Sequence, residues 1–219
     1  DGYGDPEAVR SLIRNMKPDI LWFMTDPRFY EFLWGIENEI RPLMPMVYYH
    51  VWDNYPYPTF NGKFYESNDF IANISKVTHD IVQTVSPTVD SEYVPHAVDK
   101  NSFKKLEEKE IDSLREKMFG EKLLDNDGEE KMIFFWNNRN ARRKQSGCLI
   151  YWFKDFLDKI GHDKAILMMH TDPKDPHGQD LESIVQELKL TNGEVLFSIN
   201  KVDWEGLSKI YNAADCTIN

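Results

Sequence analysis

Four basic residues gather in one short turn of the sequence, directly after an apolar run. Arg139, Arg142, Arg143 and Lys144 follow the apolar segment 133–136 and precede a segment with helical periodicity. Arginine presents a planar fork to phosphate oxygens, and lysine presents a point charge. The first turn of a helix adds unpaired backbone N–H groups and the positive end of the helix dipole. The turn is therefore predicted to bind a small anion such as a phosphate group.

Short apolar runs alternate with amphipathic runs on both sides of this turn. Apolar runs of four to six residues are typical of buried strands, and apolar residues three or four apart are typical of helices. In the first half we predict helical segments over 6–15, 28–40 and 76–85 and strands over 20–24, 46–50, 70–74 and 92–94. In the second half we predict helices over 146–160, 179–188 and 203–214 and strands over 132–136, 165–170, 194–197 and 216–218. This alternation predicts an α/β protein with parallel sheets that helices cover on both faces.

A charged region near the middle of the chain suggests a domain boundary. Segment 104–122 is rich in charge with helical periodicity, and 123–130 is polar with turn residues. We place the boundary there, with an N-terminal Rossmann-like domain over 1–120 and a C-terminal one over 121–219. Ligands of open parallel sheets bind beyond the carboxyl ends of the strands. Arg139, His170 and Asn200 are therefore expected to converge at one edge.

Composition limits the partners that the chain can bind. Its 219 residues include 37 acidic and 26 basic side chains, a formal net charge of -11. Such a chain repels nucleic acid and anionic membranes except at a local basic site, so the cationic turn favours a small anion. The only two cysteines, Cys148 and Cys216, suggest no disulfide framework or metal knuckle. Because no apolar run approaches the ~20 residues of a membrane span and the first residues lack a signal-peptide core, a cytoplasmic protein is expected.

Three ordered motifs in the second half resemble the second domain of family-4 retaining glycosyltransferases. They occupy 138–144, 167–172 and 207–215. Segments 17–20 and 94–99, and the strand ending at His50, are similar to the first domain of that family. The resemblance implies the GT-B architecture, in which two Rossmann-like parallel-sheet domains face a cleft. Both domains are expected to be incomplete here, because the family's first strand with its Gly-rich turn and its later pair of glutamates have no counterpart in these residues.

The resemblance also implies roles for individual residues. Arg139 and Lys144, with Arg143 beside them, would hold the diphosphate of a nucleotide-sugar donor and stabilise it as it leaves, without a metal ion. His50 would contact the reacting sugar, which makes His50, Arg139 and Lys144 the expected catalytic residues. His170 would also lie at the donor site. The loop after the strand over 194–197 would contact the nucleotide base through Asn200, Lys201 and Val202.

An aromatic segment, 48–60, begins within the strand that ends at His50 and continues beyond it. Aromatic rings stack on the apolar faces of sugars, so Trp52, Asp53 and Tyr55 are the expected acceptor side of the site. The string 170–177 contains residue types that ligate metals, but its two prolines and lack of a helical or hairpin register argue against a metal site.

The activity implied is transfer of a sugar from a nucleoside-diphosphate donor to a hydroxyl acceptor with retention of configuration, and no cofactor is expected beyond that substrate. Closure of the two domains would exclude water, which competes with the acceptor. Two alternatives remain open. One is a nucleotide-sugar epimerase of the same fold, and the other is a noncatalytic module that binds a nucleotide or sugar. The donor base, the sugar, the acceptor and the oligomeric state do not follow from the sequence.

Overall fold

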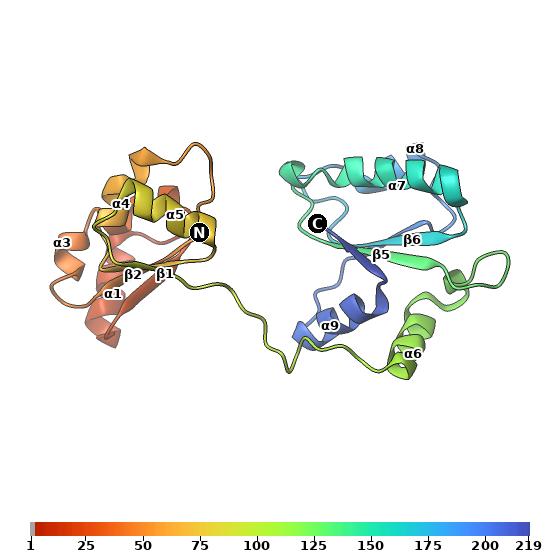
Figure 1. The fold of residues 1–219 in the computed structure, drawn as a ribbon, viewed down its shortest axis with the longest axis horizontal. Helices are drawn as coiled ribbons and strands as arrows, with labels where there is room; N and C mark the ends of the chain where they lie inside the picture. The colour runs from red at the N-terminus through yellow and green to blue at the C-terminus, as the bar shows by residue number, and fades with distance from the viewer. Residues whose placement is uncertain (1–2) are drawn as a thin grey trace. The chain divides into compact units, whose positions relative to one another are not determined.

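The computed structural model describes residues 3–219, and these form two compact units. Unit 1 ends at Ala97 and unit 2 begins at Val98. Each unit is built on a four-stranded parallel sheet with helices packed against it (Figure 1). The predicted α/β class with two parallel sheets is confirmed.

The sheet of unit 1 has its strands in the order in which they occur along the chain. These strands are β1 (Leu21–Met24), β2 (Met46–His50), β3 (Phe70–Asn73) and β4 (Ser91–Tyr93). The helices are α1 (Pro6–Met16), α2 (Glu31–Trp34), α3 (Glu37–Ile40), α4 (Gly62–Glu66) and α5 (Lys76–Val85), with 3-10 turns at Pro27–Phe29 and Thr59–Asn61. Buried side chains from the strands and from α2 to α5 form one apolar cluster, against which α1 packs.

The helices of unit 1 differ from the prediction in two places. The helix expected over 28–40 is divided into a 3-10 turn, α2 and α3. Gly35 lies at the interruption between α2 and α3, and glycine lowers helix propensity by about 1 kcal/mol relative to alanine. Helix α4 is not predicted, because it has only five residues and lies between the aromatic segment 48–60 and the strand predicted over 70–74.

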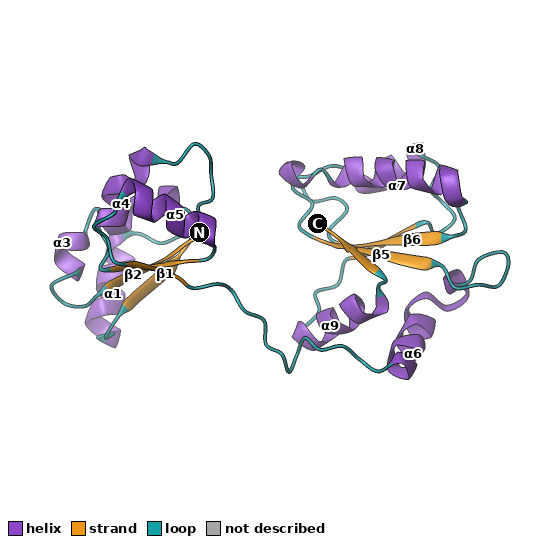
Figure 2. Ribbon diagram, viewed as in Figure 1, coloured by secondary structure: helices purple, strands orange, loops and turns teal. Residues whose placement is uncertain are grey.

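Unit 2 has the strand order β7-β6-β5-β8. Its strands are β5 (Met132–Asn137), β6 (Ala165–His170), β7 (Val195–Ser198) and β8 (Cys216–Ile218), and its helices are α6 (Glu108–Phe119), α7 (Ser146–Ile160), α8 (Leu181–Glu187) and α9 (Trp204–Ala213). A further 3-10 turn, Gly120–Leu123, follows α6. Helices α7 and α8 cover one face of the sheet, and α6 and α9 cover the other (Figure 2). The expectation of helices on both faces is therefore confirmed for unit 2, whereas the helices of unit 1 share one cluster.

The domain boundary predicted at 120/121 is wrong, because the units divide between Ala97 and Val98. Helix α6 belongs to unit 2, where Phe119 joins the cluster formed by β5, β6 and α9. Arg115 of α6 donates a hydrogen bond from Nε to the carbonyl oxygen of Ala213 at 3.1 Å. The abundant charge of this segment lies on the exposed face of an amphipathic helix, so it marks a surface and not a linker.

No helix within residues 3–219 is both long enough and apolar enough to cross a lipid bilayer.

Candidate functional site

The basic turn lies where the sequence predicts it, between the carboxyl end of β5 and the start of α7. Residues Arg142–Lys144 form a 3-10 turn, and Gln145 adopts a left-handed conformation (φ 51°) that redirects the chain into α7. Arg142, Arg143 and Lys144 are exposed. Within residues 3–219, none of the three has a carboxylate within ion-pair distance. Their charges are therefore available to an anion from solution.

Arg139, in contrast, is already paired. Its Nε lies 2.6 Å from Oδ2 of Asp175, and its Nη2 lies 3.1 Å from Oδ1. The hydrogen bonds from Arg139, and then one from the backbone of His177, lower the pKa of Asp175 to about 2. Asp175 therefore stays ionised at neutral pH and holds one edge of the guanidinium, which leaves Nη1 for a second acceptor. This pairing fixes the direction of a side chain that is otherwise 64% exposed.

A fully buried asparagine, Asn140, ties the basic turn to the loop between β6 and α8. Its Nδ2 donates to the carbonyl oxygen of Gln179 at 2.7 Å, with longer contacts to those of Asp172 and Pro173. Its Oδ1 accepts from Ser146 Oγ at 2.6 Å and from the backbone N–H of Gln179 at 3.3 Å. One side chain thus satisfies buried polar groups on both loops. The basic turn is a braced loop, which is what a preorganised anion site requires.

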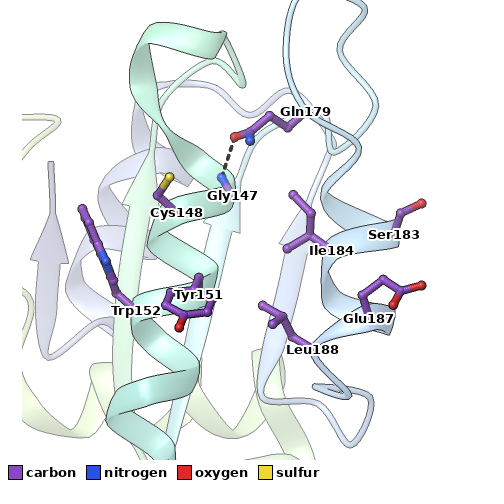
Figure 3. A pocket seen from close by; sticks show the side chains of 9 residues that line it. All are labelled: Gly147, Cys148, Tyr151, Trp152, Gln179, Ser183, Ile184, Glu187 and Leu188. Carbon is purple, nitrogen blue, oxygen red and sulfur yellow. Dashed lines mark hydrogen bonds between the residues drawn. The ribbon is translucent and has the colours of Figure 1, made fainter.

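Two glycines allow the loops to approach this closely. A Cβ on Gly178 would lie 2.0 Å from the carbonyl oxygen of Asn140, and a Cβ on Gly147 would lie 2.7 Å from Cδ1 of Ile184. The backbone N–H of Gly147 donates to Oε1 of Gln179 at 2.8 Å (Figure 3). One N–H in the first turn of α7 is therefore occupied by protein, contrary to the expectation that this turn offers only free donors.

A groove of about 450 Å³ lies between α7 and α8 (Figure 3). Ile184 of α8 and Leu188, the residue that follows α8, point toward α7, and Tyr151 lies on the α7 side of the groove. None of the predicted site residues lines it. The groove is therefore separate from the basic turn.

The remaining donor-side predictions follow the neighbouring strands of the same sheet. His170 ends β6, where it pairs in register with Asn137 of β5 and Ser198 of β7. Its Nδ1 lies 2.9 Å from Ser198 Oγ, and partial burial lowers its pKa. Asn200, Lys201 and Val202 are exposed in the loop that follows β7. The structure thus places Arg139, His170 and Asn200 after three adjacent strands, although no hydrogen bond within residues 3–219 joins them directly.

His50, at the end of β2, is fully buried in unit 1. Its Nδ1 lies 2.9 Å from Oδ1 of Asn73, and its Nε2 lies 3.0 Å from the hydroxyl of Tyr65. Because the amide oxygen can only accept, Nδ1 carries the proton and Nε2 accepts from Tyr65. Both nitrogens are thus occupied by protein. This arrangement gives no support to the prediction that His50 contacts the reacting sugar.

The stability of unit 1 is expected to depend on the protonation of His50. Burial lowers the pKa of His50 from 6.5 to about 4. Between these pH values the imidazole of His50 is therefore protonated in the unfolded chain and neutral in the folded one. Stability should therefore fall as the pH decreases from 6.5 to 4, by about 3 kcal/mol. Urea denaturation at several pH values measures this, and His50→Gln should flatten the profile. As a control, His162→Gln in unit 2 should leave the unit 1 profile unchanged; an unaltered slope in His50→Gln would refute the assignment.

The predicted acceptor-side residues lie in the loop after β2. The ring of Trp52 meets that of Phe60 edge-on at 6.2 Å, and its buried Nε1 has no hydrogen-bond partner among the described residues. Asp53 is exposed, and Tyr55 is 85% exposed beside Tyr57. This loop presents aromatic surface at the carboxyl edge of the unit 1 sheet.

In the part of the chain that the structure describes, no group of three His, Cys, Asp or Glu side chains is arranged to hold a metal ion.

Asn140, Asp175 and Gly178 are parts of the site that the sequence pattern does not indicate. The pattern of segment 170–177 argues against a metal site and assigns Asp175 no other role. A signal is nevertheless present in the sequence, because this Asp- and Pro-rich segment is followed directly by Gly178 and lies at the end of a strand predicted beside the basic turn. Such loops at adjacent strand ends are where binding residues gather.

Comparison with solved structures identifies the fold. A glycosyltransferase from Rickettsia africae ESF-5 superposes with a TM-score of 0.64 at 15% identity, over 99% of this chain and 57% of that one. An α,α-trehalose 6-phosphate synthase from Burkholderia multivorans gives a TM-score of 0.67 at 12% identity, over 95% and 51%. An E. coli structure described as trehalose-6-phosphate bound with UDP-2-fluoro glucose gives 0.63 at 13%, over 96% and 54%.

These likenesses show that the two sheets have the fold of GT-B Rossmann-like domains. The chain spans about half the length of the solved structures that it matches. No protein-family model matches the chain, and no curated protein matches it.

Proposed function

We propose that this chain is part of a glycosyltransferase that moves a sugar from a nucleoside-diphosphate donor to a hydroxyl acceptor. The observation that carries the proposal is the braced basic turn after β5, one of the two inner strands of the unit 2 sheet. Three of its cations have no acidic partner among residues 3–219, in a chain of net charge -11. A local cluster of positive charge attracts an anion that the rest of an acidic surface repels. The E. coli structure with a similar fold holds UDP-2-fluoro glucose, which supports a nucleotide-sugar ligand.

In the proposed reaction, the basic turn binds the diphosphate, which is the leaving group. As the bond between the sugar and the diphosphate breaks, negative charge grows on the departing oxygen. Arg139, Arg143 and Lys144 would stabilise that charge, with Asp175 holding the Nε edge of Arg139 in place. The hydroxyl of the acceptor then forms the new bond to the sugar and loses its proton. Retention of configuration and independence from metal ions are parts of this proposal that rest on the family resemblance.

The other site residues would contact the two substrates. His170 and the loop containing Asn200, Lys201 and Val202 follow strands adjacent to β5, which supports their assignment to the donor nucleotide. Trp52 and Tyr55 would stack on the acceptor sugar, and Asp53 would accept hydrogen bonds from its hydroxyl groups. Burial of His50 assigns it to bracing the ends of β2 and β3.

One observation favours a second candidate, a noncatalytic module that binds nucleotide sugars. The only histidine that the resemblance assigns to the reacting sugar is buried, with both ring nitrogens bonded to protein. The basic turn would serve such a module equally well. Turnover, and not binding, separates the two candidates.

The proposal is tested by calorimetric titration with UDP, GDP and ADP, their glucose conjugates, and the matching monophosphates. A diphosphate is expected to bind at least ten times more tightly than its monophosphate, because the second phosphate engages further charge-assisted hydrogen bonds. The preferred base then names the donor for an assay of sugar transfer. Conversion of donor without acceptor into an epimer would indicate the epimerase instead. Binding without any turnover would indicate the module, and absence of nucleotide binding would refute the proposal.

A further inference from the structure

The segment that connects the two units is fastened to unit 1 as far as Val94. The backbone N–H of Val94 donates to the carbonyl oxygen of Asn73 at 2.8 Å. Its carbonyl oxygen accepts a hydrogen bond from the hydroxyl of Tyr49 at 2.7 Å. The ring of His96 stacks on that of Tyr49, with centroids 5.1 Å apart and an interplanar angle of 15°, and Pro95 between them has a fixed φ. Unit 1 therefore holds the chain up to His96.

At the start of unit 2, the segment folds back on itself at Asp99. Its carboxylate accepts hydrogen bonds from the backbone N–H of Asn101 at 3.0 Å and from Ser102 Oγ at 2.8 Å. The carbonyl oxygen of Asp99 accepts from the N–H of Phe103 at 2.8 Å. These bonds make a closed turn of residues 99–103, which is a stiffer connection than an extended linker of the same length.

Beyond this turn, the side chain of Asn212 on α9 fastens the segment to unit 2. Its Nδ2 donates to the carbonyl oxygen of Lys104 at 2.9 Å, and its Oδ1 accepts from the backbone N–H of Leu106 at 2.9 Å. The ring of Phe103 meets those of Trp204 and Tyr211 of α9 edge-on. A single amide thus binds backbone groups two residues apart, which an alanine in its place cannot do.

We propose that the joint between the two units is confined to Ala97 and Val98, and that Asn212 is the positioning residue that fixes its unit 2 end. Both joint residues are exposed, and no hydrogen bond within residues 3–219 holds their backbone. Two residues supply four soft backbone torsions, which is enough freedom for the chain to change direction at this point. The inference does not depend on what the chain binds, so its failure leaves the proposed function untouched.

Limited digestion with trypsin, with the fragments identified by mass spectrometry, tests this inference. The segment offers cleavage sites after Lys100, Lys104 and Lys105. In the intact chain, cleavage after Lys104 and Lys105 is expected to be at least ten times slower than after Lys100. Asn212 ties the backbone on both sides of these two bonds to α9, whereas the turn around Lys100 is held only by hydrogen bonds within the segment itself. Asn212→Ala should raise cleavage at these two sites at least tenfold. The matched control Asn192→Ala, at an exposed asparagine of unit 2, should leave the pattern unchanged.

Equal cleavage at all three sites in the intact chain would overturn the inference without the use of any variant. So would an unchanged pattern in an Asn212→Ala chain whose unit 2 remains folded by NMR. Amide hydrogen exchange gives a second measurement, in which Ala97 and Val98 should exchange at least ten times faster than Phe103 and Leu106. Protection of Ala97 and Val98 equal to that of Leu106 would also contradict the proposed joint.

Discussion

Replacing Asn140 by alanine is expected to destabilise unit 2 by about 3–5 kcal/mol. The substitution removes the side-chain hydrogen bonds by which Asn140 joins the basic turn to the loop before α8 and to Ser146. It leaves the carbonyl oxygen of Gln179 and the hydroxyl of Ser146 without those partners in a buried setting, and each such orphan costs about 1–3 kcal/mol. Urea denaturation, followed by the NMR signals of β5 and β6, measures the loss.

The matched control is Asn126→Ala, at an exposed asparagine of the same unit. It should change stability by no more than about 0.5 kcal/mol. If Asn140→Ala proved as mild as this control, Asn140 would not be the brace of the basic turn, and a preorganised anion site would lose its structural basis.

Gly178→Ala is expected to have the second large effect, about 2–3 kcal/mol of destabilisation with displacement of the loop before α8. The new Cβ would lie 2.0 Å from the carbonyl oxygen of Asn140 and 2.5 Å from its Cγ. Neither atom can yield, because the carbonyl oxygen belongs to backbone and the Asn140 side chain is held by its hydrogen bonds. Overpacking of this kind costs about 1–3 kcal/mol and occasionally more.

Gly62→Ala provides the control for this second prediction. Its nearest neighbours lie 3.5 Å from the added Cβ, which is ordinary van der Waals contact, and Gly62 begins a helix. The variant should therefore be neutral or slightly stabilised. Equal changes in melting temperature in Gly178→Ala and Gly62→Ala would show that the loops around Gly178 can move apart without loss of stability. Shifted amide signals of residues 139–145 in Gly178→Ala would show directly that the basic turn has moved.

Much of the sheet architecture follows from local pattern in the sequence. Strands β5 and β6 and helix α7 were predicted to within one residue, because each is a long apolar or amphipathic run with a clear period. The domain boundary failed for the opposite reason. Helix α6 buries few residues. Charged residues therefore dominate its sequence, and the apolar positions that pack against unit 2 are hard to recognise among them.

The site could be predicted only in part. The basic turn is contiguous in sequence, so its residues and its place after a strand could be identified. The Arg139–Asp175 pair joins positions 36 residues apart, and its geometry depends on how two loops meet. The surroundings of His50 depend on Tyr65, which lies on a helix that local pattern did not indicate, and on Asn73 of the adjacent strand. Contacts of this kind arise from tertiary packing, which neither composition nor periodicity records.

The most direct test of the central claim is calorimetric titration of UDP into the chain and into its Arg139→Ala/Lys144→Ala variant. The variant should bind at least 100-fold more weakly, about 2.7 kcal/mol, because it loses two charge-assisted contacts to the diphosphate. A variant with the same change in net charge, Lys109→Ala/Lys117→Ala on α6, should bind within twofold of the unsubstituted chain. Equal affinities of the unsubstituted chain and the Arg139→Ala/Lys144→Ala variant would contradict the claim that the basic turn holds the diphosphate.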